Sequence, residues 1–486
     1  MAFFAPVLNV LARVLVGYAF MFLIPLAWGW TLDPPMVRNV WWVSMAITAA
    51  SGFLLWHVTM DYRRELLPRD GFLLVNLVWS VLPAFSAIPL MLAIDGLSFT
   101  DAYFETMSGF TTTGFTVLSG LDKLPLSVNV WRCVLQLFGG LGIMLLVVAV
   151  LPLLGLGSVQ LYKAEAAGPI KDDRLTPRIA ETARGLWSIY FVFSGACMLA
   201  YHWAGMSWPD AFMHMCSTMG LGGLSSHDAS FGYFNSQAIE GVAIVFMTLS
   251  GVSFARYFIV WRAKSLQPLF HDAEVRGYVG VLIASVALVT GVLIYHQTHT
   301  DPWDSLRHAA FHVVSFATTT GYATQDYSVW PIFAPVWMLA LGSFATCAGS
   351  TGGGMKMVRM ILLFKQARRE LVMAVHPRAV NPVRLGGAVI STKVMASVVA
   401  FMLFFLATHV GLTMLLLISG MDVVSAISAV VASVNNIGLA MGSVGPQGSF
   451  ASLTDFQTWV CTAGMLLGRL ELLAVMVQFV PQFWRK

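Results

Sequence analysis

Apolar runs separated by short polar segments occupy most of this chain of 486 residues. A helix of roughly 20 residues crosses the hydrocarbon core of a bilayer, which is about 30 Å thick. Runs of about this length occur at residues 8–29, 39–59, 72–93, 132–156, 186–206, 238–261, 278–296, 332–365, 392–418 and 456–480. The pattern therefore predicts an all-α polytopic membrane protein with ten spans.

A second pattern recurs between the later runs: a short apolar segment, rich in Ser, Thr or Asn, that ends on a glycine. Thirteen-residue windows align without gaps at Ala102–Gly114, Asp210–Gly222, Ala309–Gly321 and Ala426–Gly438, and the first and third are identical at seven positions. Internal repetition of this kind fixes the architecture of a chain. The last eight spans are therefore predicted to form four fused repeats of outer helix, pore helix, filter loop and inner helix around one central pore.

The domain organisation follows from this repeat. The first two spans lie outside it and are predicted to form a two-helix appendage at residues 1–70. The four pore repeats are expected at residues 71–170, 171–276, 277–384 and 385–486.

The glycine that ends each window has a physical explanation. Non-helical backbone at membrane depth is tolerated only where it is buried in protein or lines a watery cavity. Glycine adopts positive φ at little cost and so lets successive carbonyl oxygens face an axis, where they can replace the hydration shell of a monovalent cation. A glycine that only ends a helix is the alternative, but four in register favour a filter. The predicted filter residues are Thr111, Thr112, Thr113, Gly114, Thr218, Met219, Gly220, Leu221, Gly222, Thr318, Thr319, Thr320, Gly321, Val434, Asn435, Asn436, Ile437 and Gly438.

Composition agrees with a membrane protein and excludes several other classes. Hydrophobic residues make up 57% of the chain and charged residues 11%, which is more apolar surface than a soluble core needs. The formal net charge of +4 comes with no basic patch interleaved with aromatic residues, so nucleic acid is not an expected partner. The five cysteines lack CxxC spacing and are expected to be buried thiols. No cleavable signal peptide is expected.

The distribution of charge predicts the orientation in the membrane. Of the 28 Lys and Arg residues, 22 lie on or near one side of the predicted spans, which should be cytoplasmic because cytoplasmic loops carry an excess of basic residues. Both termini then face the cytoplasm. The opposite side carries the filter loops, and its acidic residues predict a mouth that concentrates cations. These acidic residues are Asp122, Asp228, Glu240, Asp301, Asp304, Asp326, Asp422 and Asp455.

The third inner helix contains a run of small residues that should break it. The run is Ser350, Thr351, Gly352, Gly353 and Gly354, and each glycine costs a helix about 1 kcal/mol relative to alanine. Because a break is tolerated only along a conduit or inside protein, we expect an intramembrane gate loop below the filter. A packing notch between helices is the alternative. Just after this run, a lysine, Lys356, is expected near the inner end of the pore.

The last span contains a buried charge. Arg469 lies inside this apolar run with Glu471 two residues further on, and a charge at membrane depth indicates function by default. The two side chains do not share a helix face. Arg469 is therefore expected to face the pore and raise the barrier to cations, while Glu471 pairs with another base. A structural salt bridge between inner helices is the alternative.

Several motifs of enzymes are incomplete. His308 and His312 have the spacing of a zinc-protease helix, but Ala309 replaces the glutamate that acts as the general base. The glycines that begin at Gly139 lie in a predicted span, and no Walker motif is present. We therefore expect neither an enzyme nor a nucleotide bound by this chain, and nucleotide control would require a partner.

Four long segments resemble the TrkH family of bacterial potassium-uptake subunits: Trp131–Pro169, Phe246–Phe270, Ala348–Gln366 and Gly464–Trp484. The resemblance extends over essentially the whole chain. It implies uptake of K⁺ across the bacterial inner membrane, a gate formed by the glycine-rich run and Arg469, a homodimer, and a cytosolic TrkA-like ring of nucleotide-binding domains.

In this wider superfamily, one filter glycine per repeat accompanies potassium selectivity, and serine at the first position accompanies sodium permeation. Glycine at all four positions therefore favours potassium, and the second window departs through an additional glycine, Gly220. The positions expected to hold K⁺ are Thr112, Thr113, Thr319, Thr320, Asn436 and Ile437.

Two questions stay open from sequence. A symporter coupled to H⁺ or Na⁺ is the alternative to a channel-like pore. The basic loops, notably Lys356–Arg384, are expected either to dock the cytosolic partner or to contact anionic membrane lipid.

Overall fold

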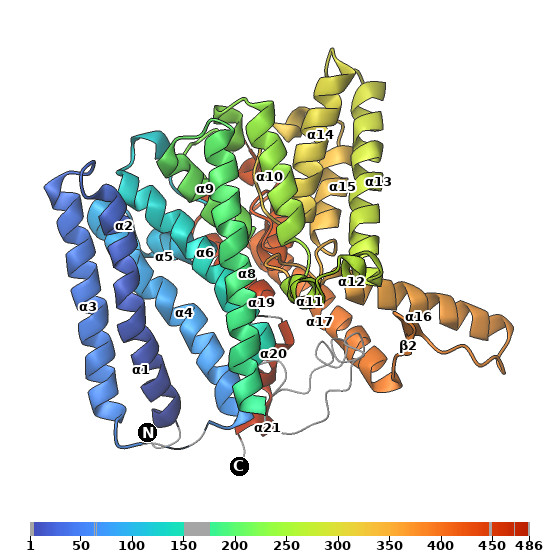
Figure 1. The fold of residues 1–486 in the computed structure, drawn as a ribbon, viewed down its shortest axis with the longest axis horizontal. Coiled ribbons are helices and arrows are strands. Elements are labelled where there is room, and N and C mark those ends of the chain that lie inside the picture. Colours follow the sequence, from blue (N-terminus) through green and yellow to red (C-terminus); the bar gives the residue numbers. More distant parts are fainter. Residues whose placement is uncertain are drawn as a thin grey trace.

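The computed structural model describes residues 4–62, 64, 66–149, 175–446, 450–470 and 472–484. These residues form a bundle of helices (Figure 1) with a two-stranded antiparallel hairpin, β1 (Arg384–Leu385) and β2 (Ala388–Val389). The predicted run at 132–156 is therefore described only as far as residue 149.

The N-terminal appendage is a helical hairpin. Its first arm is α1 (Ala5–Ala19), a 3-10 turn and α2 (Leu23–Gly29), and its second arm is α3 (Pro35–Thr59). The carboxylate of Asp33, between the arms, accepts hydrogen bonds from the backbone N–H groups of Leu126 and Ser127. The appendage is thus joined to the start of the first inner helix.

Four repeats follow, each with an outer helix, a shorter pore helix and an inner segment. The outer helices are α4 (Pro68–Ala93), α8 (Leu175–Trp203), α13 (Ala273–Tyr295) and α17 (Thr392–Ile418). The pore helices are α5 (Phe99–Phe110), α9 (Trp208–Gly220), α14 (Pro302–Ala317) and α18 (Val423–Asn435). The inner segments are α6 (Leu126–Ala149), α10 (Gln237–Ser250) with α11 (Phe254–Ala263), α15 (Phe333–Gly342), and α19 (Asp455–Arg469) with α20 (Leu472–Met476). Short helices α12 (Gln267–Phe270) and α21 (Pro481–Trp484) complete the set.

All four pore helices begin with a side-chain cap. The cap residues Ser98, Ser207, Asp301 and Asp422 each accept a hydrogen bond from a backbone N–H in the first turn. Such caps satisfy donors that have no partner within the helix. They fix where each pore helix starts, and so how far its far end reaches into the bundle.

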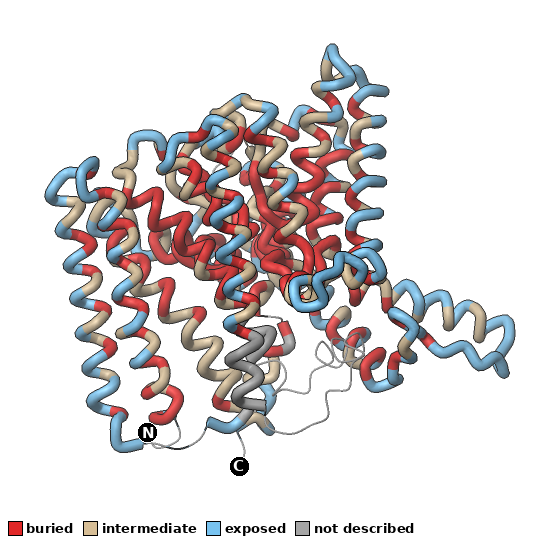
Figure 2. The backbone as a smooth tube through the Cα atoms, in the orientation of Figure 1, coloured by how far each residue is buried: buried red, intermediate tan, exposed pale blue. Residues whose placement is uncertain are grey.

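Burial separates the inner helices from the outer ones. Of the most apolar part of α6, 83% is buried, whereas the corresponding value for α17 is 22%. Figure 2 shows buried backbone gathered at the centre of the bundle and exposed residues along the outlying helices. The outer helices thus offer an apolar surface to lipid, and the pore helices are enclosed by protein.

Three of the expected spans are interrupted, as predicted for the third inner helix but not for the second and fourth. Among the described residues, seven helices are long and apolar enough to cross a membrane, or eight if the pair α10 and α11, bent by 85°, counts as one span. The other two inner segments are shorter: α15 ends at Gly342 and α19 at Arg469. The freed backbone groups find partners in the protein, since Cys347 N–H donates to the Gly251 carbonyl and Phe254 N–H to that of Gly349. Breaks at membrane depth are allowed under this condition.

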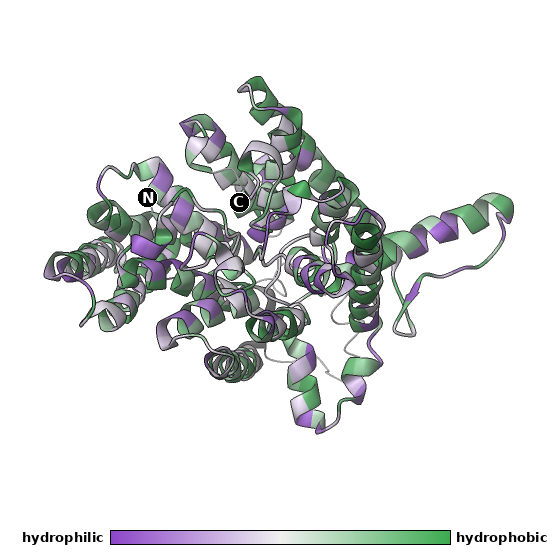
Figure 3. Ribbon diagram, turned by 90° about the horizontal axis from the view of Figure 1, so that it is seen from above, coloured by the Kyte–Doolittle hydropathy of each residue, from purple (hydrophilic) through white to green (hydrophobic). Residues whose placement is uncertain are grey.

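The two chain ends lie together, and one arm leaves the bundle. The rings of Phe4 and Trp484 are 6.0 Å apart, and Figure 1 shows both ends at the same side of the molecule. After the break that follows α15, α16 (Met357–Val375) and the β-hairpin project sideways (Figure 3), with hydrophilic positions along the helix.

Candidate ion-conducting site

The end of each pore helix has the same backbone conformation in all four repeats. One residue adopts left-handed φ, the next does not, and a glycine with positive φ follows. The left-handed residues are Thr112 (φ 53°), Leu221 (φ 53°), Thr319 (φ 60°) and Asn436 (φ 53°). The glycines are Gly114 (φ 93°), Gly223 (φ 77°), Gly321 (φ 90°) and Gly438 (φ 79°). Positive φ is a conformation that glycine adopts readily and other residues seldom do.

The four loops contact one another in cyclic order. A Cβ atom added to any of these glycines would overlap the carbonyl oxygen of the residue before the glycine of a neighbouring repeat. The contacts are Gly114 on Gly222, Gly223 on Thr320, Gly321 on Ile437, and Gly438 on Thr113. The repeats therefore follow one another around a closed ring, an order that sequence does not give.

The second repeat corrects the predicted register by one residue. Its left-handed glycine is Gly223, whereas the expected filter glycine, Gly222, corresponds to Thr113, Thr320 and Ile437. An alignment of the windows on a glycine is ambiguous in this repeat, because its loop contains two glycines in succession. The capping signal gives the observed register, because Ser98 to Gly114 and Ser207 to Gly223 span equal lengths of chain.

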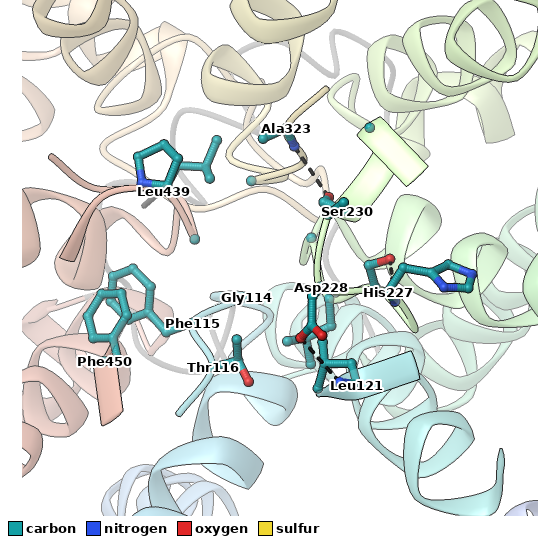
Figure 4. A pocket seen from close by; sticks show the side chains of 18 of the residues that line it. Gly114, Phe115, Thr116, Leu121, His227, Asp228, Ser230, Ala323, Leu439 and Phe450 are labelled. Atoms are coloured by element: carbon teal, nitrogen blue, oxygen red, sulfur yellow. Dashed lines mark hydrogen bonds between the residues drawn. The ribbon is translucent and has the colours of Figure 1, made fainter. Parts of the chain in front are cut away.

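A cavity of about 680 Å³ opens above this ring, and we refer to it as the mouth. All four positive-φ glycines line it, which again assigns Gly223 rather than Gly222 to the ring. Figure 4 shows the loops arranged around this space, with Asp228 pointing to the backbone of Leu121. The carboxylate of Asp228 accepts a hydrogen bond of 3.1 Å from the Leu121 N–H group.

The predicted acidic residues of the mouth divide into several roles. Among the described residues, the carboxylates that line the cavity are Asp228 and Asp326. Glu240 is buried and pairs with Arg307, whereas Asp301 and Asp422 cap pore helices. The remaining three, Asp122, Asp304 and Asp455, do not line the cavity. Several of the eight thus serve in helix caps and ion pairs, and the attraction of cations to this side of the protein stays a prediction.

One carboxylate of the group, Asp122, takes part in a bridge between repeats. His227, which lines the mouth, contacts Asp122 through Nδ1 and Asp210 through Nε2 at 3.2 Å. Burial acts to lower the pKa of His227, but its hydrogen bonds to the two carboxylates outweigh burial and raise it. The same contact lowers the pKa of Asp122.

Threonine side chains of the loops brace the backbone from behind. Thr111 Oγ1 lies 2.8 Å from Thr113 Oγ1, and the equivalent hydroxyls of Thr318 and Thr320 are 2.7 Å apart. Thr112 differs, since its buried Oγ1 has no hydrogen-bond partner among the described residues. The paired hydroxyls therefore brace the loops, whereas Thr112 Oγ1 has no such role.

The glycine-rich run forms a loop directly beneath the ring. The chain is non-helical from Ser343 to Lys356. Gly353 N–H donates to Thr319 Oγ1 at 2.8 Å, and Thr351 Oγ1 donates to the Met219 carbonyl at 3.0 Å. A Cβ on Gly353 would overlap the Asn435 carbonyl oxygen. The loop thus touches the ends of three pore helices, and the alternative of a packing notch within a continuous helix does not hold.

The predicted gate residues Gly352, Gly354, Ser350 and Lys356 belong to this loop. Lys356 Nζ donates to the Gly352 carbonyl, and Ser350 Oγ donates to that of Cys347. Gly354 has a φ of 76° and packs against the end of α15. These contacts hold the loop in a compact fold of its own.

Arg469 joins the loop to the first repeat. It is 2% exposed, and its two terminal nitrogens donate to the carbonyl oxygens of Thr351 at 2.8 Å and Gly139 at 3.2 Å. Among the described residues it forms no salt bridge, and Glu471 lies outside them. The guanidinium therefore places a positive charge beneath the ring without a carboxylate partner in the described part of the chain.

The remaining candidates have structural surroundings. His312 contacts the Gln325 carbonyl and His308 contacts Thr324 Oγ1. Among the described residues, no group of His, Cys, Asp or Glu side chains is arranged to hold a metal ion. All five cysteines are buried free thiols, which confirms the prediction.

Four loops that close a ring at the centre of a bundle of apolar helices define a multi-pass membrane protein built from four repeats around one axis. Comparison with known proteins gives the family. The chain matches the TrkH family of cation transport proteins over residues 37–486, and it belongs to that family. The predicted family and fold class are both confirmed.

Individual relatives agree with this assignment. The chain is 42% identical to the Trk system potassium uptake protein TrkH of Salmonella typhimurium, over 90% of this chain and 91% of the relative. It is 43% identical to the protein of the same name from Halomonas elongata, over 91% and 92%. The crystal structure of the potassium transporter TrkH from Vibrio parahaemolyticus superposes with a TM-score of 0.92 at 36% identity, covering 99% of this chain and all of the other.

Proposed function

We propose that this protein takes up K⁺ across the bacterial inner membrane through a channel-like pore formed by its four loops. The ring of carbonyl and glycine contacts, together with the cavity above it, is the observation that carries the proposal. Relatives that share more than 40% of its sequence are potassium uptake proteins, which supports K⁺ as the cargo.

Selectivity would arise in the ring. Carbonyl oxygens of successive loop residues replace the water around the ion, and such an exchange requires oxygens that are already held in place. The hydroxyl pairs behind the loops and the packing of each glycine on a neighbouring carbonyl supply that rigidity. The expected K⁺ positions are the six named from sequence, joined by Leu221 and Gly222 of the second repeat.

The loop from Ser350 to Gly354 and Arg469 would act as the gate. The loop lies against the underside of the ring, and Arg469 holds it through the Thr351 carbonyl. A fixed positive charge on the path opposes the passage of a cation. Opening would therefore require the loop and the guanidinium to separate from the pore helices.

Control would come from outside this chain. The projecting arm of α16 carries Lys365, Arg368 and Arg369, and it offers a basic surface to a cytosolic TrkA-like ring or to anionic lipid. We propose a homodimer with both termini in the cytoplasm. The contact of Phe4 with Trp484 supports one side for both ends.

Flux into liposomes that contain the purified protein tests the proposal. Uptake that follows the K⁺ gradient alone, and increases when the cytosolic partner is added, is the expected result. Obligatory movement of H⁺ or Na⁺ with each K⁺ would instead support the coupled symporter. Absence of K⁺ flux in both the presence and the absence of the partner would refute the pore.

A further inference from the structure

The four repeats differ in the residue that precedes the ring glycine. Three repeats carry a branched side chain there, namely Thr113, Thr320 and Ile437, whereas the second repeat carries Gly222. Gly222 does not adopt positive φ, so the backbone does not require glycine at this position. The missing side chain therefore needs another explanation.

A glutamine from the first repeat occupies the vacant volume. A Cβ on Gly222 would lie 2.5 Å from Nε2 and 2.8 Å from Oε1 of Gln136, which belongs to α6 and is fully buried. Glycine at position 222 thus makes room for the amide. Gln136 thereby places a polar group of the first repeat inside the filter loop of the second repeat.

The amide of Gln136 is hydrogen-bonded at both ends. Its Nε2 donates to the Gly222 carbonyl at 2.6 Å, and its Oε1 accepts from Ser217 Oγ at 2.6 Å and from Leu224 N–H at 3.2 Å. The last two donors precede and follow the filter turn. Gln136 therefore clamps the whole turn of the second repeat and not a single atom.

The acceptor of this bond is one of the four ring carbonyls. Gly222 O is the oxygen that packs on Gly114, as Thr113 O packs on Gly438. Among the described residues, no hydrogen bond reaches the corresponding oxygens of Thr113, Thr320 and Ile437. A carbonyl that already accepts a short N–H bond has one lone pair occupied. The field that it offers to a cation is therefore weaker than that of the other three.

The equivalent position in the fourth repeat shows that the fold does not need an amide. Gly139 packs on the Phe110 carbonyl as Gly468 packs on that of Val434, and both acceptors lie four residues before a ring glycine. Three residues before Gly468 is Met465, which is also fully buried. In the fourth repeat an apolar residue, Met465, thus stands at the position of Gln136. The next loop around the ring has a side chain, that of Thr113, where the second repeat has Gly222.

From these contacts we propose that Gln136 is a specificity-determining positioning residue, which sets the turn of the second repeat and weakens one of the four carbonyl ligands. This inference rests on the proposed conduction through the ring. Gln136 would act on the ion through Gly222, and the asymmetry would tune the preference for K⁺ over Na⁺.

The test compares relative K⁺, Rb⁺ and Na⁺ flux in liposomes for the wild type, Gln136→Met and the matched control Met465→Leu. Gln136→Met keeps the volume but removes the amide, and we expect a several-fold change in the K⁺ to Na⁺ ratio and in the K⁺ concentration for half-maximal flux. Met465→Leu is expected to leave both unchanged. A wild-type ratio in a stable Gln136→Met protein would overturn the inference while leaving the pore intact.

A second pair of variants covers the case in which Gln136→Met does not fold. Gln136→Ala leaves the volume beside Gly222 empty, and Gln136→Ala/Gly222→Ser refills it with a hydroxyl group like those of the other repeats. We expect the double variant to recover part of the selectivity lost in Gln136→Ala. Equal ion ratios for the two would overturn the inference. Loss of all K⁺ flux in the wild type would instead refute the proposed function.

Discussion

The side-chain amide of Asn436 donates a hydrogen bond to Thr113 Oγ1 at 2.8 Å, and so joins filter loops that are 323 residues apart in the chain. The same amide donates to the Met465 carbonyl at 3.0 Å. Asn436 has a φ of 53°, a conformation that asparagine tolerates better than most residues. One residue thus closes the ring between the last and the first repeat.

A double-mutant cycle on this contact should show coupling. Asn436→Gly keeps the left-handed backbone but removes the donor, and Thr113→Val removes the acceptor at nearly constant volume. We expect a coupling free energy of about 1 kcal/mol in unfolding of the detergent-solubilised protein, as for a buried hydrogen bond. Strictly additive effects of the two substitutions would show that the bond does not stabilise the ring.

The corrected register of the second repeat makes a separate prediction. Gly223→Ser should lower the preference for K⁺ over Na⁺ by about tenfold, or about 1.4 kcal/mol, because a Cβ there overlaps the Thr320 carbonyl oxygen. Gly114→Ser should act in the same way. Relative ion flux is the measurement.

Gly96→Ser is the matched control for these variants. Gly96 has a φ of 79°, close to the 77° of Gly223, but a Cβ at Gly96 meets no atom within 4 Å. Its substitution bears the same backbone strain without touching the ring. If the selectivity of Gly223→Ser matched that of Gly96→Ser, Gly223 would not belong to the filter.

Removal of the charge beneath the ring should increase flux. Arg469→Ala eliminates the two bonds to the Thr351 and Gly139 carbonyls and the barrier to cations. We expect K⁺ flux to rise by about tenfold, as for a barrier lowered by about 1.4 kcal/mol. Arg469→Lys, which keeps the charge, should stay near the wild-type rate. Unchanged flux in a stable Arg469→Ala protein would assign the arginine a structural role.

The bridge at the mouth predicts a dependence of stability on pH. Because the folded protein raises the pKa of His227, the stabilisation is present below the unfolded pKa of about 6.5 and is lost as pH rises through the higher folded value. The lowered pKa of Asp122 acts oppositely, and its stabilisation is lost only as pH falls through its folded value. The bridge should therefore weaken on going from pH 6 to pH 9.

Melting temperatures of the wild type and His227→Gln, measured across this range, check the prediction. The difference between them should shrink as pH rises. Other titratable groups beside the imidazole of His227, including His214, Tyr233 and Asp210, are common to both proteins. The difference between the two melting temperatures therefore isolates His227. A difference that is constant with pH would show that the bridge does not depend on protonation.

The sequence was sufficient for the repeats because each carries a local signal. Capping residues such as Ser98 and Asp422, apolar runs of spanning length, and terminal glycines such as Gly114 depend only on neighbours in the chain. The break at Gly352 to Gly354 was predictable for the same reason, since three glycines in succession cost any helix free energy. The family could also be recognised from long composite segments.

The structure decided what depends on contacts between repeats. The bend between α10 and α11 becomes stable only because the loop of the third repeat supplies partners for Gly251 and Phe254. The space beside Gly222 is filled by Gln136 of the first repeat, a contact that the residues around Gly222 do not indicate.

Sequence by itself thus determined that this chain contains four similar pore units in a membrane, because helix length, capping and glycine preference are local properties. Tertiary structure alone decided the order of the units around the ring and the partners of Arg469. Each of these depends on which backbone atoms from distant segments meet at the axis, where a single added carbon would overlap a carbonyl oxygen. Close packing of that kind leaves no trace in the spacing of residues along the chain.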